Sequence, residues 1–387
     1  MKQSAFRFVL LMSFVSLFAD MTYEGGRSIT GPFLARLGAS GALVGFVGGF
    51  GELLGYGLRS IAGILADRTG KYWIATYCGY AINVLTIPML AFAGTLPLAV
   101  GLILGERLGR GIRRPSSSAL VAHAGKVLGT GWVFGFREAL DQTGATLGPL
   151  AVALVLYLHG GFNHAFALLA IPAVLALVLL AMAWRQYPSP QDLEAGVPLN
   201  AQGLARGYWV YAAGGVCIAA GFADFALISY HFAKAHVFSN DLVPVVYAGA
   251  MLVGAVTAPL FGRWYDRAGI TVAIVAFGAA AFAAPFVFLG SFWPAVLGVG
   301  LWGLGLSAQD VLLTSIVTQL ASPDKRATAL GVFDTIFGVG WFAGSTIMGL
   351  LYDVSLPALV AFSVVLQLAG LPLLALARNA NAGTAKT

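Results

Sequence analysis

The sequence predicts an all-α integral membrane protein with twelve transmembrane helices in two pseudo-symmetric six-helix bundles. Of its 387 residues, 59% are hydrophobic and only 10% are charged. A soluble domain carries about 25% charged residues because its surface faces water. The composition therefore excludes a soluble enzyme, and the chain must expose apolar surface to lipid. Short motifs that recur in the two halves predict the two bundles.

The lengths of the uncharged stretches favour helices over barrel strands. A spanning helix needs about 20 apolar residues, whereas a barrel strand needs about 10 with alternating character. The stretches 72–105, 142–184 and 268–309 contain no Asp, Glu, Lys or Arg, so each is long enough for two helices. We expect spans near 7–36, 41–66, 72–93, 96–114, 130–157, 164–184, 208–235, 242–262, 270–289, 294–319, 327–352 and 357–377.

The basic residues predict the orientation of these spans. If the amino terminus is cytoplasmic, the outer loops hold only Arg36 and Lys234. The inner loops and tails hold Lys2, Arg7, Arg68, Lys71, Arg113, Arg114, Lys126, Arg185, Arg206, Arg263, Arg267, Lys325, Arg326, Arg378 and Lys386. This asymmetry predicts a multi-pass protein of the inner cell membrane with both termini in the cytoplasm. It also explains the net charge of +6 without a nucleic-acid partner.

A polar stretch divides the chain near its middle. Residues 185–206 contain Pro188, Pro190 and Pro198, which predict a cytoplasmic linker at 187–206. The linker separates an amino-terminal bundle at 1–186 from a carboxyl-terminal bundle at 207–379. A disordered tail is expected at 380–387.

Four motifs recur in the same order in the two halves. Phe18-Ala19-Asp20 returns as Phe222-Ala223-Asp224, and the loop motif at 63–70 returns at 262–269. The glycine matches are Gly109 and Gly111 with Gly303 and Gly305, and Gly135, Gly144 and Gly148 with Gly331, Gly340 and Gly344. A parallel repeat of two bundles is typical of a rocking transporter whose binding site lies between the halves.

The loop after the second span, Gly63-x-x-x-Asp67-Arg68-x-Gly70-Lys71, resembles the first signature motif of the major facilitator superfamily. The resemblance covers essentially the whole chain and implies the twelve-helix drug/proton antiporter type, which is associated with multidrug resistance. The glycines permit a tight turn and close helix approach, and the Asp and Arg can form releasable contacts. The cytoplasmic gate is therefore expected at Gly63, Asp67, Arg68, Gly70, Gly262, Asp266, Arg267 and Gly269.

Two further motifs carry the resemblance to proton-coupled members. In the fourth span, Arg107-Leu-Gly-Arg110-Gly111 resembles the family motif with a buried arginine linked to proton coupling. In the fifth span, Gly144, Gly148 and Pro149 resemble the motif that marks the family's antiporters. The glycine pair that usually follows is replaced by Val152-Ala153.

Charged residues inside the spans are candidates for the coupling site, because each costs about 2.5–3.5 kcal/mol at mid-bilayer. They follow helical spacing, so neighbours on one helix share a face. The hypothesis places proton coupling and the substrate cavity at Asp20, Glu24, Arg27, Arg107, Arg110, Arg137, Glu138 and Asp141. The alternative is that they form structural ion pairs, such as Arg137 with Asp141 or Glu24 with Arg27. Glu106 is adjacent to Arg107 and is expected to face away from it.

The carboxyl-terminal half offers fewer charges. Asp224, Asp310 and Asp334 lie in apolar spans with few basic neighbours. Such a carboxylate can be protonated, attract a cation or cap an interrupted helix, and the sequence leaves these alternatives open. Asp224 joins the candidate cavity residues because it repeats Asp20.

Signals for enzymes, cofactors and metals are absent or false. No phosphate-binding Gly-x-x-x-x-Gly-Lys-Ser/Thr motif occurs, and the Gly-x-Gly-x-x-Gly at 298–303 lies in an apolar helix without a preceding strand. Cys78 and Cys217 are expected to be packing residues. Ser116–Ser118 near His123 are the one candidate nucleophile, and helix capping explains them better. No cofactor and no metal are expected.

Together these observations predict a secondary transporter that works by alternating access. The leading prediction is proton-coupled antiport that exports a small organic molecule through the bilayer. The family resemblance implies that the protein works as a monomer. The alternative is a proton-coupled importer or facilitator of an organic anion metabolite. The arginines of the fourth span suit an anionic substrate, whereas the acids of the first and fifth spans suit a cationic drug.

Overall fold

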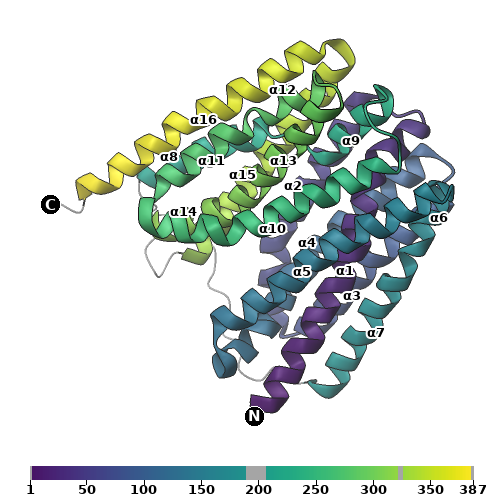
Figure 1. Cartoon of the computed structure of the whole chain (residues 1–387). Helices are drawn as coiled ribbons and strands as arrows, with labels where there is room; N and C mark the ends of the chain where they lie inside the picture. The colour runs from purple at the N-terminus through teal and green to yellow at the C-terminus, as the bar shows by residue number, and fades with distance from the viewer. Residues whose placement is uncertain (1, 189–205, 321–325, 385–387) are drawn as a thin grey trace. The chain divides into compact units, whose positions relative to one another are not determined.

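The computed structural model describes residues 2–188, 206–320 and 326–384, and all regular elements in these ranges are helical (Figure 1). The first half contains α1 (Lys2–Arg36), α2 (Gly41–Thr69), α3 (Tyr72–Met89), η1 (Leu90–Phe92), α4 (Leu96–Leu128), α5 (Thr130–Tyr157), α6 (Gly161–Leu168) and α7 (Ala170–Gln186). The second contains α8 (Arg206–Gly221), α9 (Phe225–Lys234), α10 (Leu242–Ala268), α11 (Ile270–Ala280), α12 (Ala283–Phe288), α13 (Phe292–Ala308), the π-helical turn η2 (Gln309–Leu313), α14 (Thr314–Leu320), α15 (Arg326–Val354) and α16 (Leu356–Thr384).

Eleven helical segments in the described ranges are long and apolar enough to cross a membrane, which confirms a multi-pass helical membrane protein. They cover every predicted span except the fourth. Helix α4 occupies that position, but five charged residues lie within 106–114 and lower its hydropathy. The total of twelve spans therefore stays a prediction.

Three predicted spans of the second half contain interruptions. The span at 208–235 is divided between α8 and α9 by residues 222–224, and the span at 270–289 is divided between α11 and α12 by residues 281–282. The span at 294–319 contains the π-helical turn η2. Hydropathy averages about 20 residues, so it identified these spans without showing where their hydrogen bonding changes.

The chain forms two compact units. Unit 1 comprises Met1–Gly38, Leu54–Gly196 and Ser239–Ala248, and unit 2 comprises Ala39–Leu53, Val197–Phe238 and Gly249–Thr387. Helices α2 and α10 therefore contribute residues to both units. Most of the predicted linker at 187–206 lies outside the described residues, and the predicted domain boundaries stay a prediction.

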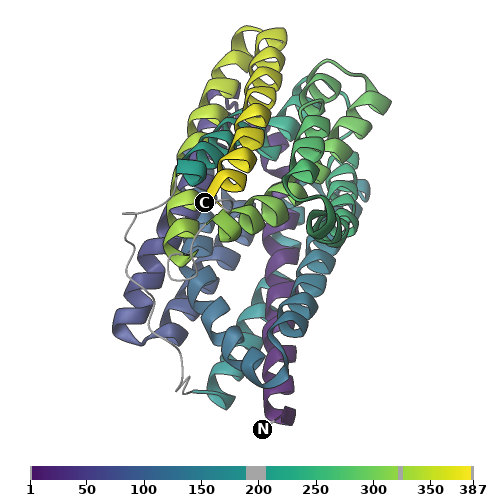
Figure 2. The same ribbon diagram turned by 90° about the vertical axis from the view of Figure 1, so that its left-hand side faces the viewer.

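In unit 1, α1 and α5 lie side by side along most of their length (Figures 1 and 2). Glycines of α5 allow this approach. A Cβ atom at Gly144 would lie against the carbonyl oxygen of Leu17, and one at Gly148 against that of Met21, both well inside 3.0 Å. Helices in lipid commonly pack through small residues in this way. The predicted antiporter motif is therefore, in this structure, the contact that holds α5 against α1.

Unit 2 uses the same device between α15 and α8. A Cβ atom at Gly344 would collide with the carbonyl oxygen of Ala220, and one at Gly340 would lie 3.1 Å from that of Val216. The Gly144/Gly148 and Gly340/Gly344 match in the sequence thus corresponds to one packing solution used in each unit.

The other glycine match is shifted in the structure. Gly109 packs against α3 at Asn83, whereas its predicted counterpart Gly303 packs against α10 at Ala250. It is Gly111 that faces α2, at Leu58, and α2 is the sequence counterpart of α10. The predicted match of Gly109 with Gly303 is therefore wrong, since the two glycines contact helices that are not counterparts in the repeat. A short glycine motif locates the contacting residue only to within one or two positions.

The first turn of α2 is held within unit 2. The Asp353 carboxylate at the end of α15 accepts hydrogen bonds from the backbone N–H of Gly41 (2.9 Å) and of Ala42 (2.8 Å). The Tyr230 hydroxyl donates to the carbonyl oxygen of Ala39 at 2.8 Å. A carboxylate at a helix amino terminus satisfies two unpaired donors and complements the helix dipole.

Alanine at the packing glycines and at open glycines should change stability in opposite directions. Gly148→Ala and Gly344→Ala should destabilise the protein by about 1–3 kcal/mol, because the added methyl group meets a backbone carbonyl. Gly101→Ala and Gly300→Ala add a Cβ that meets no described atom within 4 Å, so they should stabilise their helices by about 0.5–1 kcal/mol. Thermal unfolding of the four variants in detergent tests this, and a shift of the same sign in all four contradicts it.

Candidate functional site

The interior of unit 1 contains a cluster of buried charges from α1, α4 and α5. Asp20 is 7% exposed and Arg113 is 6% exposed. Arg113 Nη2 lies 3.8 Å from Asp20 Oδ1. The same guanidinium lies over the ring of Tyr80 at 4.4 Å and over that of Tyr23 at 5.6 Å. Two aromatic faces and a carboxylate thus compensate this buried cation.

A second pair lies on α5. Arg137 Nε lies 3.9 Å from Asp141 Oδ2, four residues along the helix, which is the ion pair that the structural alternative named. Arg137 also donates from Nε to Ser16 Oγ at 2.9 Å and from Nη2 to Ser117 Oγ at 3.3 Å. Arg137 therefore ties α5 to both α1 and α4. Ser117 is fully buried inside α4 and accepts a hydrogen bond from this arginine, so the expectation that the serine run caps a helix end is wrong.

Helical spacing explains why these side chains meet. Ser16, Asp20 and Tyr23 lie on one face of α1, and Arg113 and Ser117 lie one turn apart on α4. The close α1–α5 contact at Gly144 and Gly148 brings the Asp20 and Asp141 faces together. We call Ser16, Asp20, Tyr23, Tyr80, Arg113, Ser117, Arg137 and Asp141 the polar cluster.

Arg113 is the residue that sequence reasoning missed. The predicted fourth span ends at residue 114 and Arg113 counts among the cytoplasmic basic residues, but α4 continues through Pro115 to Leu128. The i, i+3 and i+7 spacing of Arg110, Arg113 and Ser117 was the available signal. Arg114, which the sequence placed on the same face as Arg107 and Arg110, is exposed.

Glu106 organises a neighbouring group between α3 and α4. Its carboxylate lies 3.2 Å from Arg107 Nε and 3.5 Å from Arg110 Nε, and Asn83 Nδ2 donates to it at 2.8 Å. The expectation that Glu106 faces away from Arg107 is therefore wrong, because long side chains reach a common point from adjacent positions. Arg110 also lies over the Tyr23 ring at 5.4 Å, so this group adjoins the polar cluster.

The remaining candidates in unit 1 have other surroundings. Glu24 accepts a hydrogen bond from the hydroxyl of Tyr247, at the start of α10, which the sequence did not suggest. Arg27 is buried. Glu138 is exposed and accepts a hydrogen bond from Gln142 Nε2 at 2.8 Å, one turn along α5. The polar cluster therefore contains Asp20, Arg137 and Asp141 from the predicted set, together with five residues outside it.

Asp224 lies in unit 2 at the interruption between α8 and α9. Its carboxylate accepts the Ala226 N–H at 2.8 Å and caps α9, which is one of the three alternatives left open by the sequence. The carbonyl oxygens freed by the interruption have side-chain donors. Gly221 O accepts from Ser363 and Gln367, and Ala223 O accepts from Trp302 Nε1 at 2.8 Å.

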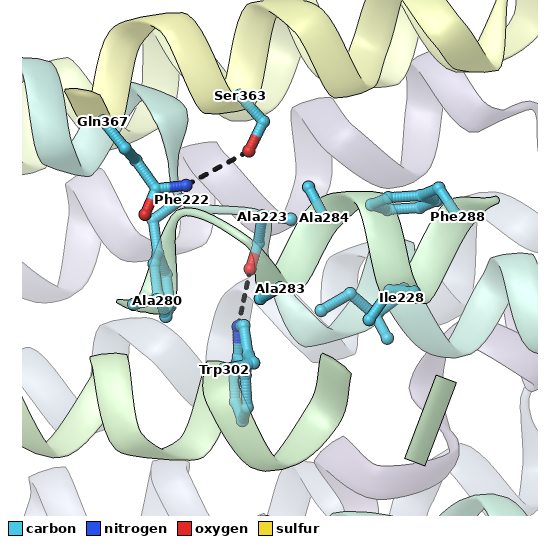
Figure 3. Close-up of a pocket in the computed structure, with 11 residues that line it drawn as sticks. Phe222, Ala223, Ile228, Ala280, Ala283, Ala284, Phe288, Trp302, Ser363 and Gln367 are labelled. Atoms are coloured by element: carbon cyan, nitrogen blue, oxygen red, sulfur yellow. Dashed lines mark hydrogen bonds between the residues drawn. The ribbon is translucent and has the colours of Figure 1, made fainter. Parts of the chain in front are cut away.

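Figure 3 shows Ala223, Trp302, Ser363 and Gln367 around a small cavity with Phe288 and three alanines, Ala280, Ala283 and Ala284. The cavity has room for about one water molecule. It is too small for an organic substrate, so the interruption acts here as an element of the fold.

The predicted gate residues lie at the ends of α2 and α10. Gly70 and Gly269 adopt φ values of +66° and +58°, which favour glycine and confirm the predicted tight turns. Gly63 lies next to Pro115 of α4, and Gly262 is half-buried in α10. Arg68, Asp266 and Arg267 are exposed, and the side chain of Asp67 lies outside the described part.

Comparison with known proteins gives consistent matches over the whole chain. The Major Facilitator Superfamily model matches residues 9–345 and 210–386. An uncharacterized protein of Mycobacterium tuberculosis is 39% identical over 376 residues, covering 95% of this chain and 92% of that protein. An uncharacterized MFS-type transporter of Methanocaldococcus jannaschii is 27% identical over 362 residues, covering 90% and 89%. The crystal structure of nucleoside transporter NupG has the same fold, with a TM-score of 0.75, 16% identity and coverage of 95% and 98%.

Removing one member of the Asp20–Arg113 pair should cost more stability than removing both. Arg113→Gln leaves a buried carboxylate without its arginine and should destabilise the protein by about 3–5 kcal/mol. Adding Asp20→Asn should restore much of that loss, because the remaining groups are neutral. Thermal unfolding of the wild type, both single variants and the double variant measures the coupling. Losses that simply add would contradict a direct interaction.

Proposed function

The chain belongs to the Major Facilitator Superfamily, and we propose that it is an antiporter that exports a small organic molecule in exchange for protons. It is a membrane transporter that works by secondary transport, and it is not an enzyme. The observation that carries the proposal is the polar cluster, in which the buried carboxylate of Asp20 on α1 faces Arg113 on α4, and the half-buried carboxylate of Asp141 faces Arg137 on the same helix.

Proton binding at this cluster changes the attraction between helices. Protonation of Asp20 removes its negative charge and its attraction to Arg113, which joins α1 to α4. Protonation of Asp141 leaves Arg137 held by Ser16 and Ser117, so that arginine keeps its place. The two carboxylates thus differ in role. Protonation of Asp20 weakens the contact between α1 and α4, whereas protonation of Asp141 changes the net charge of the cluster without moving Arg137.

The cluster also provides for exchange between proton and substrate. A substrate that binds the same arginines or carboxylates competes with a proton on Asp20 or Asp141. Each of the two changes the local charge and so weakens binding of the other. Release of one therefore favours binding of the other, which is the requirement for antiport. Glu24, Arg107 and Arg110 are proposed to line the route on either side of the cluster.

The loops after α2 and α10 form the cytoplasmic gate in this proposal. Both combine a left-handed glycine, Gly70 or Gly269, with charged residues at the helix end. Both termini are cytoplasmic and the membrane is the inner cell membrane, in accord with the distribution of Lys and Arg. The functional unit is a monomer.

A second candidate function is proton-coupled import of an organic anion. The observation in its favour is the series of guanidinium groups on α4, where Arg107 and Arg113 are buried and Arg110 lies between them. Guanidinium groups bind carboxylates and phosphates with two parallel hydrogen bonds. The two functions differ in the direction of proton movement: protons move opposite to the substrate in antiport and with the substrate in proton-coupled import.

Asp20→Asn and Asp141→Asn should abolish proton-driven transport but spare downhill exchange. Purified protein is placed in liposomes with an acidic lumen and a trapped pH dye, and organic cations, anions and neutral amphiphiles are added outside. In the wild type, one panel should alkalinise the lumen. In the variants that signal should fall at least about tenfold, because an amide cannot carry the proton, while labelled substrate should still exchange between equal concentrations.

Asp241→Asn, which changes an acid outside the polar cluster, is the matched control and should retain proton movement. Full proton movement in both cluster variants would contradict the proposal. Proton movement in the same direction as substrate would establish the import alternative.

A further inference from the structure

The interior of unit 2 contains a row of aromatic rings contributed by α8, the interruption that follows it and α15. Tyr211 packs on Phe333 at 5.8 Å between ring centroids, and Phe337 packs on Trp341 at 5.8 Å. Trp341 packs in turn on Phe222, at 5.5 Å. Phe333 and Phe337 are joined at 5.6 Å, so the row is continuous. We call Tyr211, Phe222, Phe333, Phe337 and Trp341 the aromatic row; none of these side chains is charged at neutral pH.

Trp341 of this row, and Gln309 directly after the α13 residues that pack on Phe222, are buried polar side chains without a hydrogen-bond partner in the described part of the chain. Trp341 is 2% exposed, and its Nε1 donor is unused. Gln309 is 6% exposed, and both its Nε2 donor and its Oε1 acceptor are unused. Buried indole and amide groups almost always have partners, because an unmet donor or acceptor loses its hydration without replacement.

The position of Gln309 places it beside the row. It lies four residues after Gly305, where an added Cβ would be 2.8 Å from the ring of Phe222, and seven after Trp302, whose ring stacks on Phe222 at 5.8 Å. Residues at these spacings share a helix face. Gln309 also begins the π-helical turn η2, and such turns are frequent at functional sites. The Tyr211 hydroxyl donates to Leu313 O, at the other end of the turn.

We infer that Gln309 and Trp341 form a binding subsite for an uncharged, planar heteroaromatic group that carries a hydrogen-bond donor and an acceptor. The ring of the ligand stacks against the aromatic row. An acceptor atom of the ligand accepts a hydrogen bond from the Trp341 N–H. The Gln309 amide accepts from the donor of the ligand and donates to its acceptor. The inference names the chemical class of the transported substrate. It rests on the proposed function only in treating the bound molecule as that substrate.

The chain provides matched controls for both residues. Trp302 is a buried tryptophan whose Nε1 is used, since it donates to Ala223 O at 2.8 Å (Figure 3). Gln367 is a buried glutamine whose Nε2 donates to Gly221 O at 3.0 Å and to Ser363 Oγ at 3.2 Å. Removing these groups orphans backbone carbonyls, whereas removing the Gln309 and Trp341 groups orphans nothing in the described protein.

The test measures thermal stability and ligand binding of purified protein in detergent, where no proton gradient is needed. Gln309→Met and Trp341→Phe should leave the melting temperature without ligand unchanged or raised. Trp302→Phe and Gln367→Met should lower it. Uracil and nicotinamide serve as uncharged heteroaromatic probes, with benzoate and benzylamine as charged ones. At least one uncharged probe should bind the wild type, and its Kd should rise at least about tenfold in Gln309→Met and in Trp341→Phe.

Several results would overturn the inference. A fall in melting temperature of Gln309→Met and Trp341→Phe as large as that of the controls would make both residues structural. Unchanged Kd values in both variants, binding of charged probes alone, or binding of none of the uncharged probes would each reject the assigned ligand class. Absence of proton movement in liposomes, with probe binding retained, would reject the proposed antiport and leave this subsite in place.

Discussion

The compensation of buried charge is the constraint on which the rest of unit 1 depends. A charged side chain at mid-bilayer costs about 2.5–3.5 kcal/mol, so helices that carry such groups are stable only where opposite charges meet. Asp20 on α1 meets Arg113 on α4, and Arg137 on α5 meets Asp141 and two serines. The glycine contact between α1 and α5 serves this requirement, since a wider spacing would separate Arg137 on α5 from Ser16 on α1.

Unit 2 meets a related constraint with uncharged groups. Its interruption between α8 and α9 frees carbonyl oxygens in an interior where water is scarce, and each such oxygen requires a donor. Trp302 provides one for Ala223 O, while Ser363 and Gln367 both serve Gly221 O. Donors from two other helices thus stabilise the interruption as a defined feature. This explains how an otherwise apolar span accommodates Asp224 as a helix cap.

The sequence predicted what depends on composition and local spacing. Uncharged stretches indicated the helices, the i, i+4 rule indicated Arg137 with Asp141, and Gly70 and Gly269 indicated left-handed turns. The partners of Asp20 depended on tertiary packing, and Arg113 was missed because the predicted fourth span ends at residue 114. Interruptions were missed because hydropathy records apolar character and not hydrogen bonding. The Glu24–Tyr247 contact joins residues more than 200 positions apart, and local sequence patterns do not predict contacts between such distant positions.

The two units share a repeat, yet the repeated aspartate has a different chemical role in each. Asp20 lies against a guanidinium, so its charge state alters a contact between helices. Asp224 is tied to the Ala226 N–H at the start of α9, where it completes a helix end. Arg113 has no basic counterpart in α13, since the residues at and next to the matching position are Gly305, Leu306 and Ser307. Loss of the negative charge would weaken an attraction between two helices at Asp20, whereas at Asp224 it would weaken the cap of α9. The divergence therefore gives one repeated position two structural roles, an ion pair between helices in unit 1 and a helix cap in unit 2.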